Sequence, residues 1–469
     1  MIRLFVISII AAFAFSCSTH PPKTTVSISL LNENINEAEM IIVENFINME
    51  RETLKVSANE EGKFIFDVYL QHPQIVYLAL GSRRMELYLD QGGTLELSAD
   101  MNNWEESLAF NGRYANENAF LVRYNREVEQ AYGQNRLFGM MSELSPDDFI
   151  GFMNEKEDAW SALISDFTSD ETLDRKFLNF FRINMHYSAY TLHIYYPMYY
   201  EYFTGETADL PEGYYDFMQD ALQYDDHYFN VRDFTQFLNE YTNFYISSNP
   251  DSFGEDTDRF ANQIWVAENV LEGKARYFVK ANAINASLNW GDFAAAEAAF
   301  FDFKDNSPYS QFIDALETSY HDALRVAPGN QAPSFTLTDI HGSQVSLSDF
   351  DGQVVYLDFW ASWCGPCMRE VPYAKKLKER FADTDDLVFL YISVDEDLNA
   401  WRNTVEAQNI QGVHLNVRGM RHEVAELYNV KGVPSFFIID RNGVIYDNNP
   451  GRPSSGEVID EQLRSALGA

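Results

Sequence analysis

The segment Val354–Pro372, VVYLDFWASWCGPCMREVP, decides how the last third of this chain folds. It begins with an apolar run that one aspartate interrupts, which is typical of a strand buried on both faces. Cys364 and Cys367 follow, three positions apart, where the strand pattern changes to a helical one. Gly365-Pro366 between them makes the turn into that helix. A strand that leads directly into a helix indicates an α/β layered domain.

Strands and helices alternate on both sides of this segment. Pro328-Gly329-Asn330 marks a boundary, and we expect one α/β domain over residues 328–469. The expected strands are 332–339, 345–350, 354–360, 387–395, 413–417 and a hairpin within 432–448 that turns at Arg441-Asn442-Gly443, and the expected helices are 367–382, 398–408, 421–428 and 456–467.

Residues 24–112 show short runs in which apolar and polar residues alternate, separated by turns such as Glu61-Gly62 and Gly92-Gly93. This pattern predicts an antiparallel β domain, a sandwich or an open barrel. The expected strands are 26–31, 39–45, 63–70, 75–80, 84–90 and 94–99. These residues hold no catalytic constellation.

Residues 113–327 have a helical period, which predicts an α-helical middle domain. Ser145-Pro146-Asp147-Asp148 has the cap, the proline and the acids of a helix start. The other expected helices are 115–131, 171–195, 212–224, 229–245, 256–285 and 291–302. Aromatic residues crowd this region, as in HIYYPMYYEYF at 193–203. They form either a core between helices or a surface that docks a peptide or another substrate.

The N-terminus has the features of a targeting segment. A short basic start and an apolar run at 4–15 are too short to cross a bilayer and fit a signal peptide over residues 1–17, followed by a polar tether at 18–23. Ala14-Phe15-Ser16-Cys17 resembles the lipobox of bacterial lipoproteins, although Phe15 is large for that motif. The resemblance implies a lipid on Cys17 and a membrane anchor. Ordinary cleavage to a soluble secreted protein is the alternative.

Charge and cysteine content limit the function. The 469 residues include 71 Asp+Glu and 34 Lys+Arg, a formal net charge of −37, which argues against nucleic acid as a partner. The chain has 3 cysteines. Because Cys17 belongs to the targeting segment, Cys364 and Cys367 remain for chemistry or for a metal, not for a disulfide framework.

WCGPC after an apolar strand, with Val433-Pro434 about 70 residues later, resembles the thioredoxin superfamily. The flanking residues APSFTLTDIHGSQVSLSDFDGQ and MREVP are similar to the TlpA/ResA-like branch of membrane-attached extracytoplasmic thioredoxins. The resemblance covers about 330–469 and implies a thioredoxin fold. The end of the β region also resembles the small β domain that precedes thioredoxin modules in many Bacteroidota lipoproteins.

The two cysteines have distinct expected roles. A disulfide is attacked by a thiolate, so the first cysteine needs a lowered pKa. Cys364 stands at the strand-to-helix junction, where free backbone N–H groups and the helix dipole favour negative charge. We expect Cys364 to be the exposed nucleophile and Cys367, one turn later, to be the resolving thiol that releases the client.

Two acids are expected to tune the dithiol. Asp358 interrupts a buried strand, and burial should raise its pKa. It matches the buried acid of thioredoxins, which implies that it accepts the Cys367 proton, through water; a structural, hydrogen-bonded acid is the alternative. Glu370 matches the glutamate of WCxPCxxE in ResA-like proteins, which implies an effect on thiol acidity. An exposed acid that favours the helix dipole is the alternative there.

The remaining expected site residues bind the client. Pro434 matches the loop proline that is cis in thioredoxins, which implies that the Val433 backbone lies beside the sulfurs and can pair with a substrate strand. Trp360 and Trp363 are expected to shield the site and to offer apolar surface.

The sequence therefore predicts a thiol–disulfide oxidoreductase without a cofactor or a metal site. The Gly-Pro pair resembles that of reducing thioredoxins, so protein disulfides are the expected clients and an upstream electron donor the second partner. The expected location is the cell envelope, lipid-anchored and facing the periplasm. Two alternatives stay open: soft-metal binding by the two cysteines, for example of copper, and a redox-inactive binding lipoprotein.

Overall fold

The computed structural model describes residues 21–32, 35–141, 143–254 and 258–468. The predicted signal segment and Cys17 lie outside the described residues. The chain forms two compact units, Met1–Phe46 with Arg51–Tyr241, and Ile47–Glu50 with Thr242–Ala469. The division falls inside the helical middle region, whereas the limits expected from the sequence lie at its two ends.

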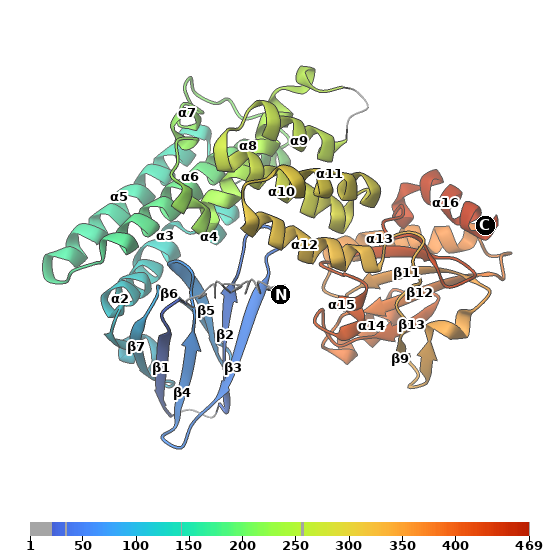
Figure 1. Cartoon of the computed structure of the whole chain (residues 1–469), viewed down its shortest axis with the longest axis horizontal. Helices are drawn as coiled ribbons and strands as arrows, with labels where there is room; N and C mark the ends of the chain where they lie inside the picture. The colour runs from blue at the N-terminus through green and yellow to red at the C-terminus, as the bar shows by residue number, and fades with distance from the viewer. Residues whose placement is uncertain (1–20, 33–34, 142, 255–257, 469) are drawn as a thin grey trace, which may run out of the picture. The chain divides into compact units, whose positions relative to one another are not determined.

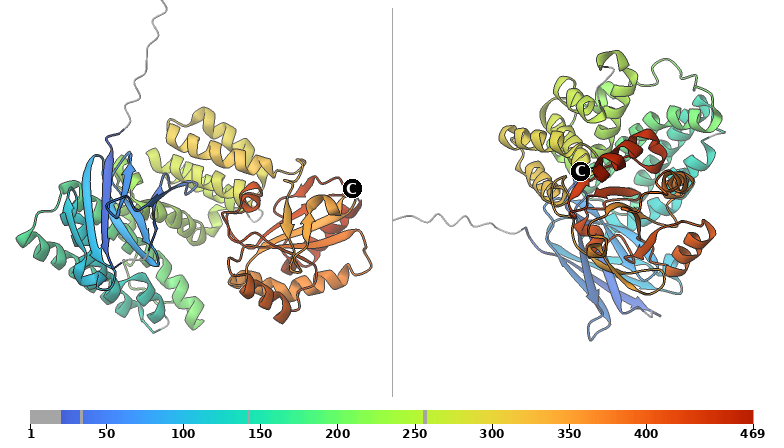
Figure 2. Two further views of the ribbon diagram at one scale, coloured as in Figure 1. Left: turned by 90° about the horizontal axis from the view of Figure 1, so that it is seen from below. Right: turned by 90° about the vertical axis from the view of Figure 1, so that its right-hand side faces the viewer.

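The β region of the first unit consists of two four-stranded sheets (Figures 1 and 2). One has the order β4-β1-β7-β8 and the other the order β3-β2-β5-β6. The strands are β1 (Thr24–Leu31), β2 (Glu37–Val43), β3 (Arg51–Ser57), β4 (Lys63–Val68), β5 (Gln74–Leu80), β6 (Arg83–Leu89), β7 (Gly93–Asp100) and β8 (Ala109–Gly112). Alternate side chains of β1, such as Val26 and Ile28, are buried in the core that both sheets share.

Two features of these sheets differ from expectation. The pair β1–β7 is parallel, so the region is not purely antiparallel. A strand at β3 was not expected, because RETLKVS is mostly charged or polar and has little apolar alternation. It pairs with β2 alone and lies at the edge of its sheet, where side chains need not be apolar.

Helices make up the rest of the first unit. They are α1 (Trp104–Ser107), α2 (Ala115–Tyr124), α3 (Gln130–Tyr132), α4 (Gln134–Met140), α5 (Pro146–Asp170), α6 (Arg175–Thr204), α7 (Met218–Ala221) and α8 (Arg232–Ser248), which continues into the second unit. The predicted start of α5 is confirmed, because Ser145 Oγ accepts the Asp148 N–H at 3.3 Å. The helix expected at 115–131 is interrupted by a π-helical turn over Asn125–Glu129.

Most of the aromatic residues of α6 are buried or half-buried, and a few are exposed. Tyr196 is fully buried and stacks on Phe149 with ring centroids 4.1 Å apart. Tyr202 and Phe203, at the end of the same helix, are exposed. Most of the expected crowding is therefore core, and an exposed remainder lies at the C-terminal end of α6.

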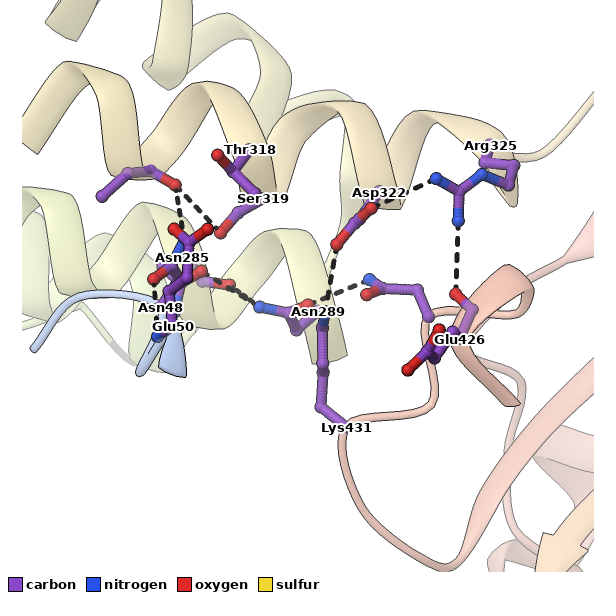
Figure 3. Close-up of polar contacts among 12 residues, drawn as sticks. Asn48, Glu50, Asn285, Asn289, Thr318, Ser319, Asp322, Arg325, Glu426 and Lys431 are labelled. Atoms are coloured by element: carbon purple, nitrogen blue, oxygen red, sulfur yellow. Dashed lines mark hydrogen bonds and ion pairs between the residues drawn. The ribbon is translucent and has the colours of Figure 1, made fainter. Parts of the chain in front are cut away.

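The second unit begins with a helical segment of α9 (Arg259–Asn269), α10 (Gly273–Trp290), α11 (Phe293–Asn306) and α12 (Ser310–Arg325). The single helix expected at 256–285 is two helices, and α12 was not expected at all. The loop residues Ile47–Glu50 belong to this unit. Asn285 donates to the Ile47 carbonyl at 2.8 Å. Asn48, which Figure 3 shows, donates to the Ala315 carbonyl at 3.1 Å.

The C-terminal domain is built on a five-stranded mixed sheet of order β13-β12-β11-β14-β15. The strands are β11 (Val354–Trp360), β12 (Leu387–Ser393), β13 (Val413–Asn416), β14 (Ser435–Ile439) and β15 (Ile445–Asp447), with a separate pair, β9 (Thr336–Thr338) and β10 (Gln344–Ser346). All residues of β11 are buried, as its apolar run predicts. It lies in the centre, parallel to β12 and antiparallel to β14.

Helices cover both faces of this sheet (Figure 1). They are α13 (Gly365–Arg380), α14 (Leu398–Ala407), α15 (Glu423–Leu427) and α16 (Glu457–Gly468). Each lies where a helix was expected, and the domain has the predicted α/β thioredoxin fold. Among the described residues, none of the helices combines the length and the apolar character needed to cross a bilayer.

Candidate active site

Cys364 and Cys367 form a disulfide at the end of β11 and the start of α13. Cys364 is the N-cap residue of that helix, and its sulfur accepts the Cys367 backbone N–H at 3.1 Å. An anionic sulfur at this position would lie at the positive end of the helix dipole, next to unpaired N–H groups. The local structure therefore favours the thiolate form of Cys364 after reduction.

The expected exposure of Cys364 is wrong for this disulfide form. Both cysteines are only 4% exposed. Trp363, just before the disulfide, is 65% exposed and offers an apolar side chain to solvent, as expected. Trp360 does not, because it is the last residue of β11 and its side chain is 2% exposed within the core.

Val433 and Pro434 lie beside the disulfide, as the sequence indicated. Their peptide bond is cis. The Val433 carbonyl oxygen is 3.5 Å from Cys364 Sγ. Ser435 begins β14, which pairs with β11, so the loop that holds Val433 is fixed next to the strand that leads to the cysteines. A client segment that reaches Cys364 therefore meets the backbone at Val433.

Asp358 is buried in the middle of β11, and its Oδ1 has no hydrogen-bond partner among the described residues. Burial raises the pKa of Asp358 well above its usual range, and the charge of Glu370 raises it further. Asp358 is on β11 and Glu370 is on α13, so the two elements that flank the disulfide each carry one of these acids. A buried carboxyl whose pKa is raised is a stronger base than an ordinary carboxylate once it is ionised, and it can then accept a proton from a thiol that reaches it.

Glu370 is held by Ser454, at the start of the turn before α16. Its two carboxylate oxygens accept the Ser454 backbone N–H at 2.9 Å and the Ser454 hydroxyl at 2.8 Å. The side chain is partly exposed rather than fully solvated. Glu370 lies beyond the first turn of α13, which contains no acid, so the interpretation as a first-turn acid is not supported. Its charge raises the pKa of Asp358, and an effect on the acidity of the thiols stays a prediction.

Asp395 is a site residue that the sequence reading missed. It follows β12 and is 1% exposed. Its carboxylate accepts the Ser362 backbone N–H at 2.9 Å, the Ser362 hydroxyl at 2.5 Å and the Ser393 hydroxyl at 2.7 Å. The network fixes the loop two residues before Cys364. A buried acid at the end of an apolar strand, SVDE at 393–396, was the signal that could have found it.

An open cavity of about 1000 Å³ lies beside Trp363. Its other walls are the loops after β12 and β13, with both acidic and basic side chains. Within the described ranges, we find no group of three or more His, Cys, Asp or Glu side chains that could hold a metal ion.

Comparison with known proteins identifies the domain. The sequence model of the Redoxin family matches residues 327–463. A thiol-disulfide oxidoreductase ResA from Bacillus thuringiensis is 31% identical over 137 residues, which are 29% of this chain and 76% of that protein. The thioredoxin-like protein YneN of Bacillus subtilis is 31% identical over 135 residues, 28% of this chain and 77% of that protein.

One similar solved structure is the thioredoxin domain of a thiol-disulfide oxidoreductase from Bacteroides vulgatus, which is 28% identical to this chain. The match has a TM-score of 0.27 and covers 30% of this chain and 96% of the other chain. These matches concern the C-terminal domain. The sequence similarity and the disulfide at the start of α13 agree on one activity. The chain belongs to the TlpA/ResA-like thiol-disulfide oxidoreductases of the thioredoxin family.

Proposed function

We propose that this protein reduces disulfides of client proteins in the cell envelope, on the periplasmic side, and is held at the membrane by a lipid on Cys17. The observation that carries the redox part is the Cys364–Cys367 disulfide at the N-terminus of α13, the helix that follows the strand with the buried Asp358. The lipobox-like Ala14-Phe15-Ser16-Cys17 and the apolar run before it support the location.

The first step is attack on the client. In the reduced protein the Cys364 thiolate attacks one sulfur of the client disulfide, forms a mixed disulfide with it and releases the other client sulfur as a thiolate. The helix N-terminus stabilises the attacking anion. The Val433 backbone beside Cys364 Sγ supplies polar groups with which an extended client segment can pair.

The second step releases the client. Cys367 loses its proton and attacks Cys364 Sγ, which forms the internal disulfide and expels the second client thiolate. Two electrons have then passed from the dithiol to the client. Asp358 is the proton acceptor for Cys367 in this proposal, and its buried Oδ1 without a partner supports that role. An upstream donor must return two electrons to Cys364 and Cys367 before the next cycle.

Reduction, rather than oxidation, is supported by the residues between the cysteines and by Asp358. Gly365-Pro366 is the pair found in reducing thioredoxins. Thioredoxin has a potential near −270 mV and the oxidant DsbA near −120 mV, and a protein that reduces clients should lie toward the former. Equilibration with glutathione or dithiothreitol at fixed ratios measures this potential.

The test is an insulin-turbidity assay with dithiothreitol as the donor. The wild-type chain should accelerate precipitation, and Cys364→Ser should abolish the acceleration. Cys367→Ala should instead accumulate clients as mixed disulfides on Cys364, which mass spectrometry can identify. If the wild-type chain does not reduce insulin but binds Cu(I) tightly, the result would favour soft-metal binding by the two cysteines instead.

The location needs its own experiment. Cells that express the chain are labelled with a radioactive or clickable fatty acid, and their membranes are separated from the soluble fractions. Lipid label on wild type and none on Cys17→Ala is the expected result. Equal release of both proteins in soluble form would contradict the anchor, without any effect on the redox proposal.

A further inference from the structure

The helical segment of the second unit reaches the client side of the redox domain. A cavity of about 170 Å³ lies between the C-terminal end of α10 and the loops of the C-terminal domain. Trp290 and Asn289 line it from α10, and Pro434 and Ser435 line it from the start of β14. Pro434 follows Val433, whose carbonyl is 3.5 Å from Cys364 Sγ, so one wall of the cavity belongs to the loop that contacts the disulfide.

Several polar contacts hold the helical segment against the redox domain, as Figure 3 shows for part of the set. Asn449 donates to the Trp290 carbonyl at 2.6 Å. On α12, Asp322 pairs with Lys431 at 3.2 Å, and Arg325 donates to the Glu426 carbonyl at 3.2 Å (Figure 3). These contacts hold the backbone of Trp290 in place, while the residue itself is 56% exposed.

One buried group in this cavity, Asn429 Oδ1, has no partner among the described residues. The neighbouring Asn289 explains the orientation of that side chain. Asn289 Nδ2 donates to the carbonyl and the side chain of Asn285, and Asn289 Oδ1 accepts a hydrogen bond from Asn429 Nδ2 at 3.0 Å. That arrangement fixes the orientation of the Asn429 amide. Asn429 lines the cavity and is 8% exposed, and its Oδ1 is buried without a hydrogen bond to any described residue. An unpaired buried acceptor is costly and calls for an N–H donor.

A cation lines the same cavity. Arg452 is exposed, and its guanidinium forms no hydrogen bond or ion pair within the described part of the chain. The whole chain has a formal charge of −37, and Arg452 places a positive charge in the wall of this cavity. An arginine in this state binds carboxylates well.

We propose that this cavity is a client subsite, which binds an extended segment next to the reacting cysteine of the client and favours an acidic side chain there. A backbone N–H of the segment bonds to Asn429 Oδ1, the side chain packs against Trp290, and its carboxylate reaches Arg452. The cavity is smaller than those that hold cofactors or drug-sized ligands, which suits one side chain of a peptide. The inference rests on the proposed function and names the clients that the redox site prefers.

The experiment compares two kinds of disulfide with the reduced full chain in single turnovers, followed by acid quench and mass spectrometry. The first substrate is glutathione disulfide. The second is a set of nine-residue peptides with a central glutathionylated cysteine and either Glu or Lys at each flanking position in turn. The variants are Trp290→Ala and Arg452→Gln. Phe301→Ala is the matched control, because Phe301 is an exposed aromatic residue on α11 that does not line the cavity.

Wild type should react faster with Glu than with Lys at one flanking position. Trp290→Ala should lower the rate constant for that Glu peptide about five- to tenfold, and Arg452→Gln should remove the preference for Glu. Glutathione disulfide should react at the wild-type rate with both variants, and Phe301→Ala should match wild type throughout. Thermal melts confirm that each variant is folded.

Two results would overturn the subsite. One is that both variants reduce all peptides at the wild-type rate, which would mean that the cavity does not bind the client. The other is an equal loss with glutathione disulfide and with peptides, which would place Trp290 in support of the dithiol itself. A wild-type chain that reduces neither substrate would instead refute the proposed function on which the subsite rests.

Discussion

Ser362 and Asp395 are joined by two hydrogen bonds, from the Ser362 backbone N–H at 2.9 Å and from its hydroxyl at 2.5 Å. They link the loop before Cys364 to the end of the neighbouring strand β12. The Ser393 hydroxyl donates to the same carboxylate. The position of Cys364 therefore depends on an acid that is 31 residues away in the sequence.

We predict that Asp395→Ala both destabilises the protein and slows its attack on clients. Each buried donor left without an acceptor costs about 1–3 kcal/mol, so the free energy of unfolding should fall by on the order of 2–4 kcal/mol. Urea denaturation measures the loss. Glu396→Ala, at the exposed neighbouring position, should leave stability unchanged within about 0.5 kcal/mol. Equal effects of the two substitutions would refute a positioning role.

Asp358→Asn should make the oxidised protein more stable at neutral and alkaline pH. The pKa of Asp358 is raised by burial, so its protonated form is the one that the fold favours. The stability this gives is fully present below the ordinary pKa of about 3.9, and it is lost as the pH rises toward the raised value. Asparagine has no such loss.

Unfolding free energies of wild type and Asp358→Asn, measured from pH 4 to pH 9, test this sign. The advantage of the variant should grow by about 1.4 kcal/mol for each pH unit between the two pKa values. The same variant should slow the release of mixed disulfides, since it cannot accept a proton. A difference in stability that does not change with pH would contradict the raised pKa.

Glu370→Gln should lower the pKa of Asp358. The negative charge of Glu370 disfavours ionisation of Asp358, and glutamine removes that charge while it still accepts a hydrogen bond from Ser454. In a plot of the rate of mixed-disulfide release against pH, the limb that depends on Asp358 should move to lower pH. Asp358→Asn lacks this limb and serves as the reference. An unchanged profile would leave Glu370 only its contact with Ser454.

Residues whose chemistry is local could be predicted from the sequence. The apolar run of β11 and the turn at Gly365-Pro366 follow from their own neighbours, and the structure has them as expected. The cis bond before Pro434 was implied by the resemblance to thioredoxins, and it is also present. The buried aspartate within the run can also be recognised from the sequence, because an acid in an apolar strand is costly unless it is paired or functional.

Features that depend on distant segments could not be predicted in this way. The partner of Asp395 is set by the packing of two strands, and the strand β3 exists because it pairs with β2 although its own pattern is polar. The exposure of Cys364 was misjudged for a similar reason: the loop at Val433 covers the sulfur, and no local pattern records that contact. The cavity at Trp290 likewise joins residues more than 130 positions apart.

Arg380 and Asp460 form a clamp between α13 and α16, with three contacts of 2.7–3.0 Å between the guanidinium and the carboxylate. The planar fork of arginine fits the carboxylate in a way that lysine cannot. Arg380→Ala should cost on the order of 2–3 kcal/mol, because it leaves a largely buried carboxylate, and Arg380→Lys should recover less than half of that loss. Full recovery in the lysine variant, measured by urea denaturation, would mean that charge alone matters.

The edge strand β15 is covered by the residues that lead into the redox domain. Gly329 donates to the Ile445 carbonyl at 2.8 Å, Ile445 donates to the Asn330 carbonyl at 2.8 Å, and Ala332 donates to the Gly443 carbonyl at 2.9 Å. Val326, at the end of α12, is buried in the core of the same domain. The isolated domain therefore needs these residues in order to cover its sheet edge.

A truncated protein that begins at residue 326 should thus be a stable monomer, whereas one that begins at residue 333 should be less stable and prone to associate. The shorter protein loses three backbone hydrogen bonds, each worth about 0.5–1.5 kcal/mol, and exposes an unpaired edge to a second copy. Thermal melts and sedimentation at several concentrations separate the two effects. Equal melting temperatures and monomeric behaviour of both proteins would show that β15 is protected without the preceding segment.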